Sequence, residues 1–137
     1  MELSRALEAR GYARAAVTGA LERLAREGWL DDLAAARAAA RSRARRYGRG
    51  RIERELSARG FSRETIAEVL QERGAAEESE TLAGVFHRLE RAYARLPIEK
   101  RRLKIRSALL RRGFAADEVS EIMKGSDEVD RGSGEIP

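Results

Sequence analysis

The chain has 137 residues, a formal net charge of +5 and a charged fraction of 37%, and it contains no cysteine. The lack of cysteine excludes disulfides, thiolate metal ligands and cysteine nucleophiles. No apolar run approaches the ~18 residues that a membrane-spanning helix needs, and the first residues do not form a signal peptide. We therefore expect a cytoplasmic protein without a membrane segment.

An internal repeat is the clearest pattern in the chain. Residues 7–12, 56–61 and 109–114 each read Leu, two variable residues, Arg, Gly and an aromatic residue. The three glycines lie 49 and 53 residues apart. Apolar residues also stand four positions before each leucine, and six and ten positions after each glycine. They are Leu3, Ile52 and Ile105, then Val17, Ile66 and Val119, then Leu21, Leu70 and Met123.

This spacing predicts two helices joined at a corner. Apolar residues four positions apart share one face of a helix. Arg followed by Gly ends the first helix, because arginine is favoured at the negative C-terminal end and glycine accepts the left-handed cap conformation. The aromatic residue then fills the corner and the second helix begins. Ser62 is a suitable N-cap for the second helix of the middle repeat.

A third helix is predicted after each of the first two pairs. The first covers residues 32–47, with Leu33, Ala36, Ala40, Ala44 and Tyr47 as its inner stripe. It follows a connection at residues 28–32, in which Asp31 or Asp32 serves as the cap. The second covers residues 77–95, with Leu82, Val85, Phe86, Leu89 and Tyr93 inside.

The last repeat is predicted to stop after its second helix, near Lys124. Residues 125–137 contain glycine, serine and acidic residues without periodicity, which is typical of a disordered acidic tail. The predicted fold is therefore all-α: an elongated tandem array of three-helix repeats with about eight to nine helices. We assign the repeats to residues 1–47, with a short first helix, to 48–96, and to 97–124, which is partial. Each unit of such an array contacts mainly its neighbours.

No catalytic constellation is visible in the sequence. His87 is the single histidine, and no cysteine or second histidine could join it as a metal ligand. The Asp31–Asp32 pair is better explained as a helix cap than as an acidic metal site. The segment Gly48-Arg49-Gly50 lacks the spacing and the ending of a phosphate-binding loop. We therefore expect no enzyme activity, no metal and no cofactor.

Basic residues gather in two clusters. Residues 37–54 contain eight arginines and one acid, and residues 100–112 are also strongly basic. Such charge attracts phosphates or an acidic protein surface, although a GC-rich genome would also raise the arginine content. The candidate binding residues are Arg37, Arg41, Arg43, Arg45, Arg46, Arg49 and Arg51 in the first cluster, and Lys100, Arg101, Lys104, Arg111 and Arg112 in the second.

The sequence around the middle repeat resembles the bacterial RecX family. The resemblance lies in Trp29-Leu30-Asp31-Asp32, in the stretch from Tyr47-Gly48-Arg49-Gly50-Arg51 to Arg59-Gly60-Phe61, and in the late segment 109–114. It covers roughly residues 2–124. Alanines occupy positions in the helix at 32–47 where larger apolar residues are usual in the family.

The resemblance implies a partner and an activity. RecX proteins are built from three-helix repeats, bind the RecA recombinase, lie in the groove of the RecA–DNA filament, and restrain its ATPase, coprotease and strand-exchange activities. No catalytic residues carry over from the family. We therefore expect a monomeric regulator, with RecA and its filament as partners, and weak nonspecific DNA binding beside that role.

Two other readings remain open at this point. The chain could be a nonspecific DNA-binding protein that acts without RecA. Sequence-specific readout is disfavoured, because the candidate helices offer alanine and arginine rather than the Asn, Gln, Ser or Thr that contact base edges. The chain could also be an adaptor array with an unrelated partner.

Overall fold

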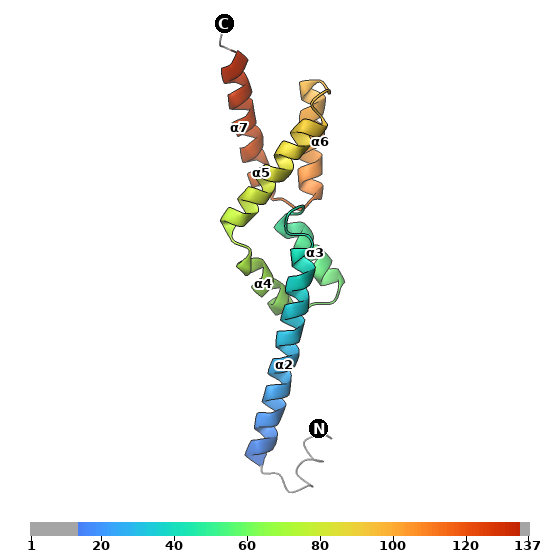
Figure 1. Cartoon of the computed structure of the whole chain (residues 1–137), viewed down its shortest axis with the longest axis vertical. Helices are drawn as coiled ribbons and strands as arrows, with labels where there is room; N and C mark the ends of the chain where they lie inside the picture. Colours follow the sequence, from blue (N-terminus) through green and yellow to red (C-terminus); the bar gives the residue numbers. More distant parts are fainter. Residues whose placement is uncertain (1–13, 135–137) are drawn as a thin grey trace.

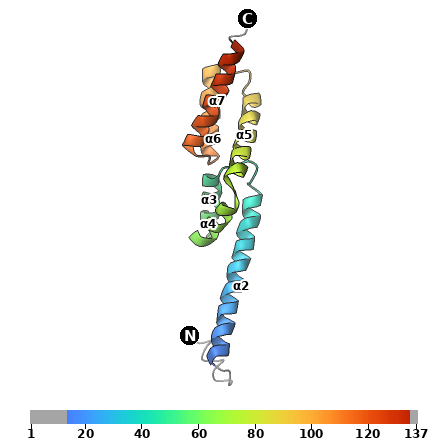
Figure 2. The ribbon, with the colours of Figure 1, turned by 90° about the vertical axis from the view of Figure 1, so that its left-hand side faces the viewer.

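The structure, a computed structural model, describes residues 14–134 and contains six helices and no strand within that range. They are α2 (Arg14–Arg41), α3 (Arg49–Ala58), α4 (Arg63–Glu72), α5 (Ala75–Ala92), α6 (Ile98–Arg111) and α7 (Ala116–Gly134). Figures 1 and 2 show them in an elongated arrangement, with the first half of α2 extending beyond the other helices. The all-α fold class is confirmed. The first predicted helix, with Leu3, Leu7 and Gly11, lies outside the described residues.

Residues 14–134 hold six helices against the predicted eight to nine for the whole chain; one predicted helix lies outside that range, and α2 unites two others. The predicted connection at residues 28–32 is wrong: Gly28, Asp31 and Asp32 all lie inside this 28-residue helix. A single glycine costs a helix only about 1 kcal/mol, and the surrounding alanine, leucine, arginine and glutamate residues favour helix. Both aspartates are exposed and need no capping role. The helix also ends at Arg41, earlier than the predicted Tyr47, in a turn over residues 42–46.

The predicted corners at Gly60 and Gly113 are confirmed. Both glycines have φ +89°, the left-handed conformation. At the first corner, the Phe61 amide donates to the Leu56 carbonyl and the Gly60 amide to the Ser57 carbonyl. The same pair of bonds recurs at the second corner, so both are Schellman caps. The Ser62 cap is also confirmed, because its hydroxyl accepts a hydrogen bond from the Thr65 amide at 3.2 Å.

Two separate hydrophobic clusters form the core. One contains Leu33 and Ala36 of α2 with buried residues of α3 and α4, and the other joins buried residues of α5, α6 and α7. The apolar residues predicted at 52, 56, 66 and 70, and at 105, 109, 119 and 123, are all buried. Each cluster takes its first helix from one sequence repeat and its other two from the next. The packing units therefore cross the boundaries predicted near residues 47 and 96.

Helix α7 continues to Gly134, so its predicted end near Lys124 is wrong, and residues 125–134 are helical. No proline interrupts this stretch, and Asp127 forms an ion pair with Arg102 of α6, which ties the continued helix to its neighbour. Residues 135–137 of the predicted tail lie outside the described residues.

Candidate partner-binding surface

The two packing units meet at residues 42–50, which we call the joint. Its backbone carbonyls are bonded by side chains from later helices. Arg73 donates from Nη1 to the Ala44 carbonyl at 3.0 Å and from Nη2 to the Tyr47 carbonyl at 2.8 Å. Arg88 donates to the Arg45 carbonyl at 3.2 Å. The turn keeps a few backbone bonds of its own, such as that from the Tyr47 amide to the Arg43 carbonyl, and arginine side chains satisfy three of its other carbonyls.

A buried ion pair stands beside the joint. Arg73, at the end of α4, and Glu78, in α5, are 7% and 3% exposed, and Arg73 Nε lies 2.5 Å from Glu78 Oε2. The other carboxylate oxygen, Oε1, accepts a hydrogen bond from the Arg49 amide at 3.0 Å. Since Arg73 also bonds two joint carbonyls, both charges have the partners that burial demands.

The Gly113 corner packs directly on the joint. The Gly48 amide donates to the Arg112 carbonyl at 2.7 Å, and the Gly50 amide donates to the Gly113 carbonyl at 3.0 Å. A Cβ built on Gly113 would lie 2.1 Å from the Arg51 amide nitrogen, so only glycine fits. The corner predicted to end α6 therefore also attaches the third repeat to the second.

The two basic clusters, distant in sequence, meet around Tyr47. The guanidinium carbons of Arg51, Arg43 and Arg112 lie 4.9, 5.6 and 5.9 Å from the centre of its ring. Glu55 accepts hydrogen bonds from both Arg43 and Arg51. These cation–π and ion-pair contacts show that several candidate binding arginines support the structure of the joint.

The candidate residues divide into two groups. Five have partners within the protein. Arg37 bonds Glu72 of α4, Arg49 donates to the Arg73 carbonyl at 3.2 Å, and Arg112 donates to the Arg46 carbonyl at 3.1 Å. Arg43 and Arg51 are the other two. The hydrogen bond to Glu72 is the main reason that the pKa of Arg37 is raised and, reciprocally, that the pKa of Glu72 is lowered.

The second group faces outward. Lys104 lies over the Tyr93 ring at 5.7 Å. Within residues 14–127, six more candidate side chains form no hydrogen bond or ion pair and are exposed or partly exposed: Arg41, Arg45, Arg46, Lys100, Arg101 and Arg111. These cations are available to a partner.

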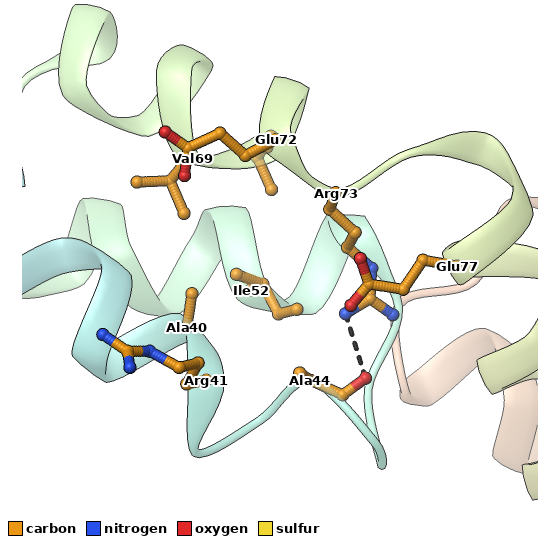
Figure 3. A pocket seen from close by; sticks show the side chains of 9 residues that line it. Ala40, Arg41, Ala44, Ile52, Val69, Glu72, Arg73 and Glu77 are labelled. Atoms are coloured by element: carbon orange, nitrogen blue, oxygen red, sulfur yellow. Dashed lines mark hydrogen bonds between the residues drawn. The ribbon is translucent and has the colours of Figure 1, made fainter.

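A small pocket opens beside the joint, between α2, α3 and α4. Figure 3 shows Ala40, Ile52 and Val69 facing it, with Arg41 and Glu72 directed away from its centre and Arg73 bonded to Ala44. Its volume is about 140 Å³. The pocket exists because alanines at 40 and 44 are too short to fill the space between the helices.

Two buried side chains and one partly buried carboxyl near the joint were not predicted from the sequence. The burial of Glu78 could have been predicted, because its spacing places it on the same face of the helix as the buried Leu82, Val85 and Leu89. Neither Arg73 nor Glu118 is marked by any local pattern. Glu118 Oε2 is buried and has no hydrogen-bond partner in the described part of the chain.

His87 is exposed and lies near Glu90, with 3.4 Å between Nδ1 and Oε1. Among the side chains described, those of residues 14–127, no group of three or more potential metal ligands occurs. No helix within residues 14–134 is long and apolar enough to cross a membrane.

Comparison with known proteins decides the family. Residues 31–70, which span the first packing unit, match the sequence profile of the second three-helix domain of RecX. The regulatory protein RecX of Ectopseudomonas mendocina is 36% identical over 131 residues, covering 93% of this chain and 85% of the relative. The chain belongs to the RecX family.

Other RecX proteins extend the comparison. RecX of Halorhodospira halophila is 38% identical over 132 residues, covering 94% of this chain and 80% of the relative. The crystal structure of RecX from Lactobacillus salivarius superimposes with a TM-score of 0.63 at 20% identity, over 92% of this chain and 83% of that one. The RecX resemblance predicted from the sequence is confirmed, and the chain is a regulator of the RecX type.

Proposed function

We propose that this chain binds the RecA recombinase, lies along the RecA–DNA filament, and restrains its ATPase, coprotease and strand-exchange activities. Membership of the RecX family carries this proposal. The elongated shape and the free cations support it, because a long basic body can contact several filament subunits and nearby phosphates at once. A body that bridges subunits hinders any cycle in which they must move relative to one another.

The first test measures DNA-dependent ATP hydrolysis by RecA while the full chain is titrated in. Binding along a filament affects many subunits, so we expect inhibition at substoichiometric amounts. Unchanged hydrolysis at equimolar protein, with the chain shown to be folded, would reject the proposal.

A second test asks whether the exposed arginines near the joint contact the filament. Arg41 and Arg45 are exposed and have no partner within residues 14–127, so Arg41→Glu with Arg45→Glu should leave the fold intact. Arg49 is unsuitable for this test, because its side chain bonds the Arg73 carbonyl and its amide bonds Glu78. We expect weaker filament binding and a shallower dependence of affinity on salt.

The matched control is Arg23→Glu with Arg26→Glu, which changes the net charge equally at two exposed positions in the first half of α2. An equal loss of filament affinity in both variants would show that only the total charge of the protein matters. Undiminished inhibition by the Arg41 and Arg45 variant would remove these residues from the binding surface.

The free cations also favour nonspecific DNA binding as a second candidate function. A gel-shift titration on naked single-stranded DNA, with and without RecA, separates the two. Equal affinity for DNA in both arms, without any effect on ATP hydrolysis, would favour action without RecA.

A further inference from the structure

The outward face of α6 carries large apolar side chains that the core does not use. Leu103 is 68% exposed and Leu110 is 39% exposed. They are seven positions apart, so they share one face of the helix. Ile105 and Leu109 point to the opposite side, where they are buried among α5 and α7.

The repeat itself shows that the fold does not require leucine at these positions. When the corner glycines Gly60 and Gly113 are aligned, 53 residues apart, the equivalents of Leu103 and Leu110 on α3 are Gly50 and Ser57. Ile105 and Leu109, by contrast, correspond to Ile52 and Leu56 on α3, and all four are apolar and buried. The exposed leucines are thus particular to the last repeat.

Uncompensated positive charge surrounds the two leucines. On one side of the helix lie Lys100, Lys104 and Arg111, and Arg106 lies on the other. Glu99 is the single acid in α6. Except for the contact of Lys104 with the Tyr93 ring, none of these four cations has a partner within residues 14–127.

The surface beside Leu103 is hollowed on both sides. Tyr93, Lys104 and Arg111 help to line one hollow, of about 310 Å³, towards α5. Arg106 and Met123 help to line the other, of about 250 Å³, towards α7. Leu103 lines both hollows, so its apolar side chain stands beside basic side chains in each; Glu99 is the one acid among the lining residues.

We propose that this face of α6 is a docking site for an acidic protein segment that carries apolar side chains, presented by RecA subunits. The inference rests on the proposed function and adds the chemistry of one contact. Acidic side chains would pair with the four cations, while apolar ones would bury Leu103 and Leu110. DNA alone would use the cations, but its phosphates gain nothing from exposed leucine.

The test compares two pairs of exposed leucines. Leu103→Ser with Leu110→Ser removes the proposed contact, and Leu24→Ser with Leu30→Ser removes two leucines from α2 that are 57% and 48% exposed. We expect the α6 variant to need about tenfold more protein for half-inhibition of RecA ATP hydrolysis, because the apolar area that two leucines would bury against the partner is lost. Its helicity and its affinity for naked DNA should match those of the parent, and the α2 variant should inhibit normally.

Equal inhibition by the parent and the α6 variant would reject the docking site while leaving the proposed function intact. An equal loss of inhibition in the α6 and α2 variants would also reject the docking site. Failure of the parent itself to inhibit RecA would reject the proposed function, and the docking site with it.

A second measurement identifies the partner directly. Leu103 is replaced by the photo-cross-linker p-benzoylphenylalanine in the full chain, which is irradiated on RecA filaments. Cross-links to the RecA protein are expected. Cross-links only to DNA, or none from a chain that still inhibits, would overturn the proposal.

Discussion

Gly60 and Gly113 share one backbone conformation but stand in different surroundings. Each has φ +89°, which costs any other L-residue about 1–2 kcal/mol. A Cβ at Gly60 would meet no atom within 4 Å, whereas one at Gly113 would meet the backbone and Cβ of Arg51 at 2.1–2.8 Å. The second corner therefore has a steric requirement that the first lacks.

Gly60→Ala should destabilise the protein by about 1 kcal/mol, from the backbone conformation alone. Gly113→Ala should lower the free energy of unfolding several times more than Gly60→Ala does, because α3 must move away from the corner. Urea denaturation of the two variants measures the difference in unfolding free energy. Equal losses would show that the contact between Gly113 and Arg51 does not hold in solution.

Glu118 is a second residue whose surroundings matter. Burial, followed by the charges of Glu78 and Asp117, raises the pKa of its carboxyl above the ordinary value of 4.5. The folded state therefore holds the Glu118 proton more tightly than the unfolded state. Stability is lost as the pH rises from 4.5 through the raised pKa, since a charge must then be kept beside the joint.

Glu118→Gln should raise the melting temperature at neutral pH, because it removes the charge of this partly buried carboxyl. The gain should shrink as the pH falls below 4.5, where the parent carboxyl is protonated in both states. Glu121→Gln, at an exposed position on the same helix, is the control for the change of net charge. Thermal unfolding followed by circular dichroism across this pH range checks the prediction, and a pH-independent difference would contradict it.

At the scale of helices, α2 departs most from the sequence prediction. Glycine followed by two aspartates is typical of a helix boundary, yet the helix continues through residues 28–32. Only the part of α2 near Leu33 and Ala36 packs on α3 and α4. A bend at Gly28 would require contacts that repay the broken helical bonds, and local residue types do not reveal whether such contacts exist.

Gly28→Ala therefore discriminates between a continuous helix and a connection. In a continuous helix it should stabilise the protein by up to about 1 kcal/mol, because alanine loses less entropy and no atom lies within 4 Å of the added methyl. Gly84→Ala, inside α5 and equally open, gives the reference gain. A loss of stability or helicity at position 28 alone, seen by circular dichroism, would indicate a connection there.

The sequence predicted those elements that depend on local chemistry. Helix periodicity and the left-handed glycines belong to single segments, so both corners and the Ser62 cap could be found. The division of the arginines into paired and free ones could not. Arg37 meets Glu72 from 35 positions away, and Arg112 reaches the joint across 66 positions. Whether a basic residue serves the fold or a partner is decided by such distant contacts.

For the whole molecule, cohesion depends on a polar junction. The two hydrophobic clusters are separate, and the joint between them is held by Arg73, Glu78 and the Gly113 corner. Removing one member of a buried ion pair leaves an uncompensated charge, which typically costs 3–5 kcal/mol. The relative placement of the two units thus depends on a few groups.

Arg73→Met should destabilise the protein by about 3–5 kcal/mol, because Glu78 stays buried without its partner and two joint carbonyls lose their donor. Arg37→Met breaks an exposed ion pair and should change stability far less. Urea denaturation compares the two. Similar small losses would show that water or other side chains replace Arg73 at the joint.

The interleaved packing also bears on how such a chain can gain or lose repeats. A cut at a boundary between sequence repeats would separate a helix from the pair it covers and leave two apolar faces in water. A crossover at equivalent points inside successive third helices removes or adds one whole period and leaves every remaining helix pair covered. Relatives with different numbers of repeats are therefore expected to differ by whole three-helix repeats. The sequence at each junction, inside a third helix, should keep an unbroken amphipathic pattern.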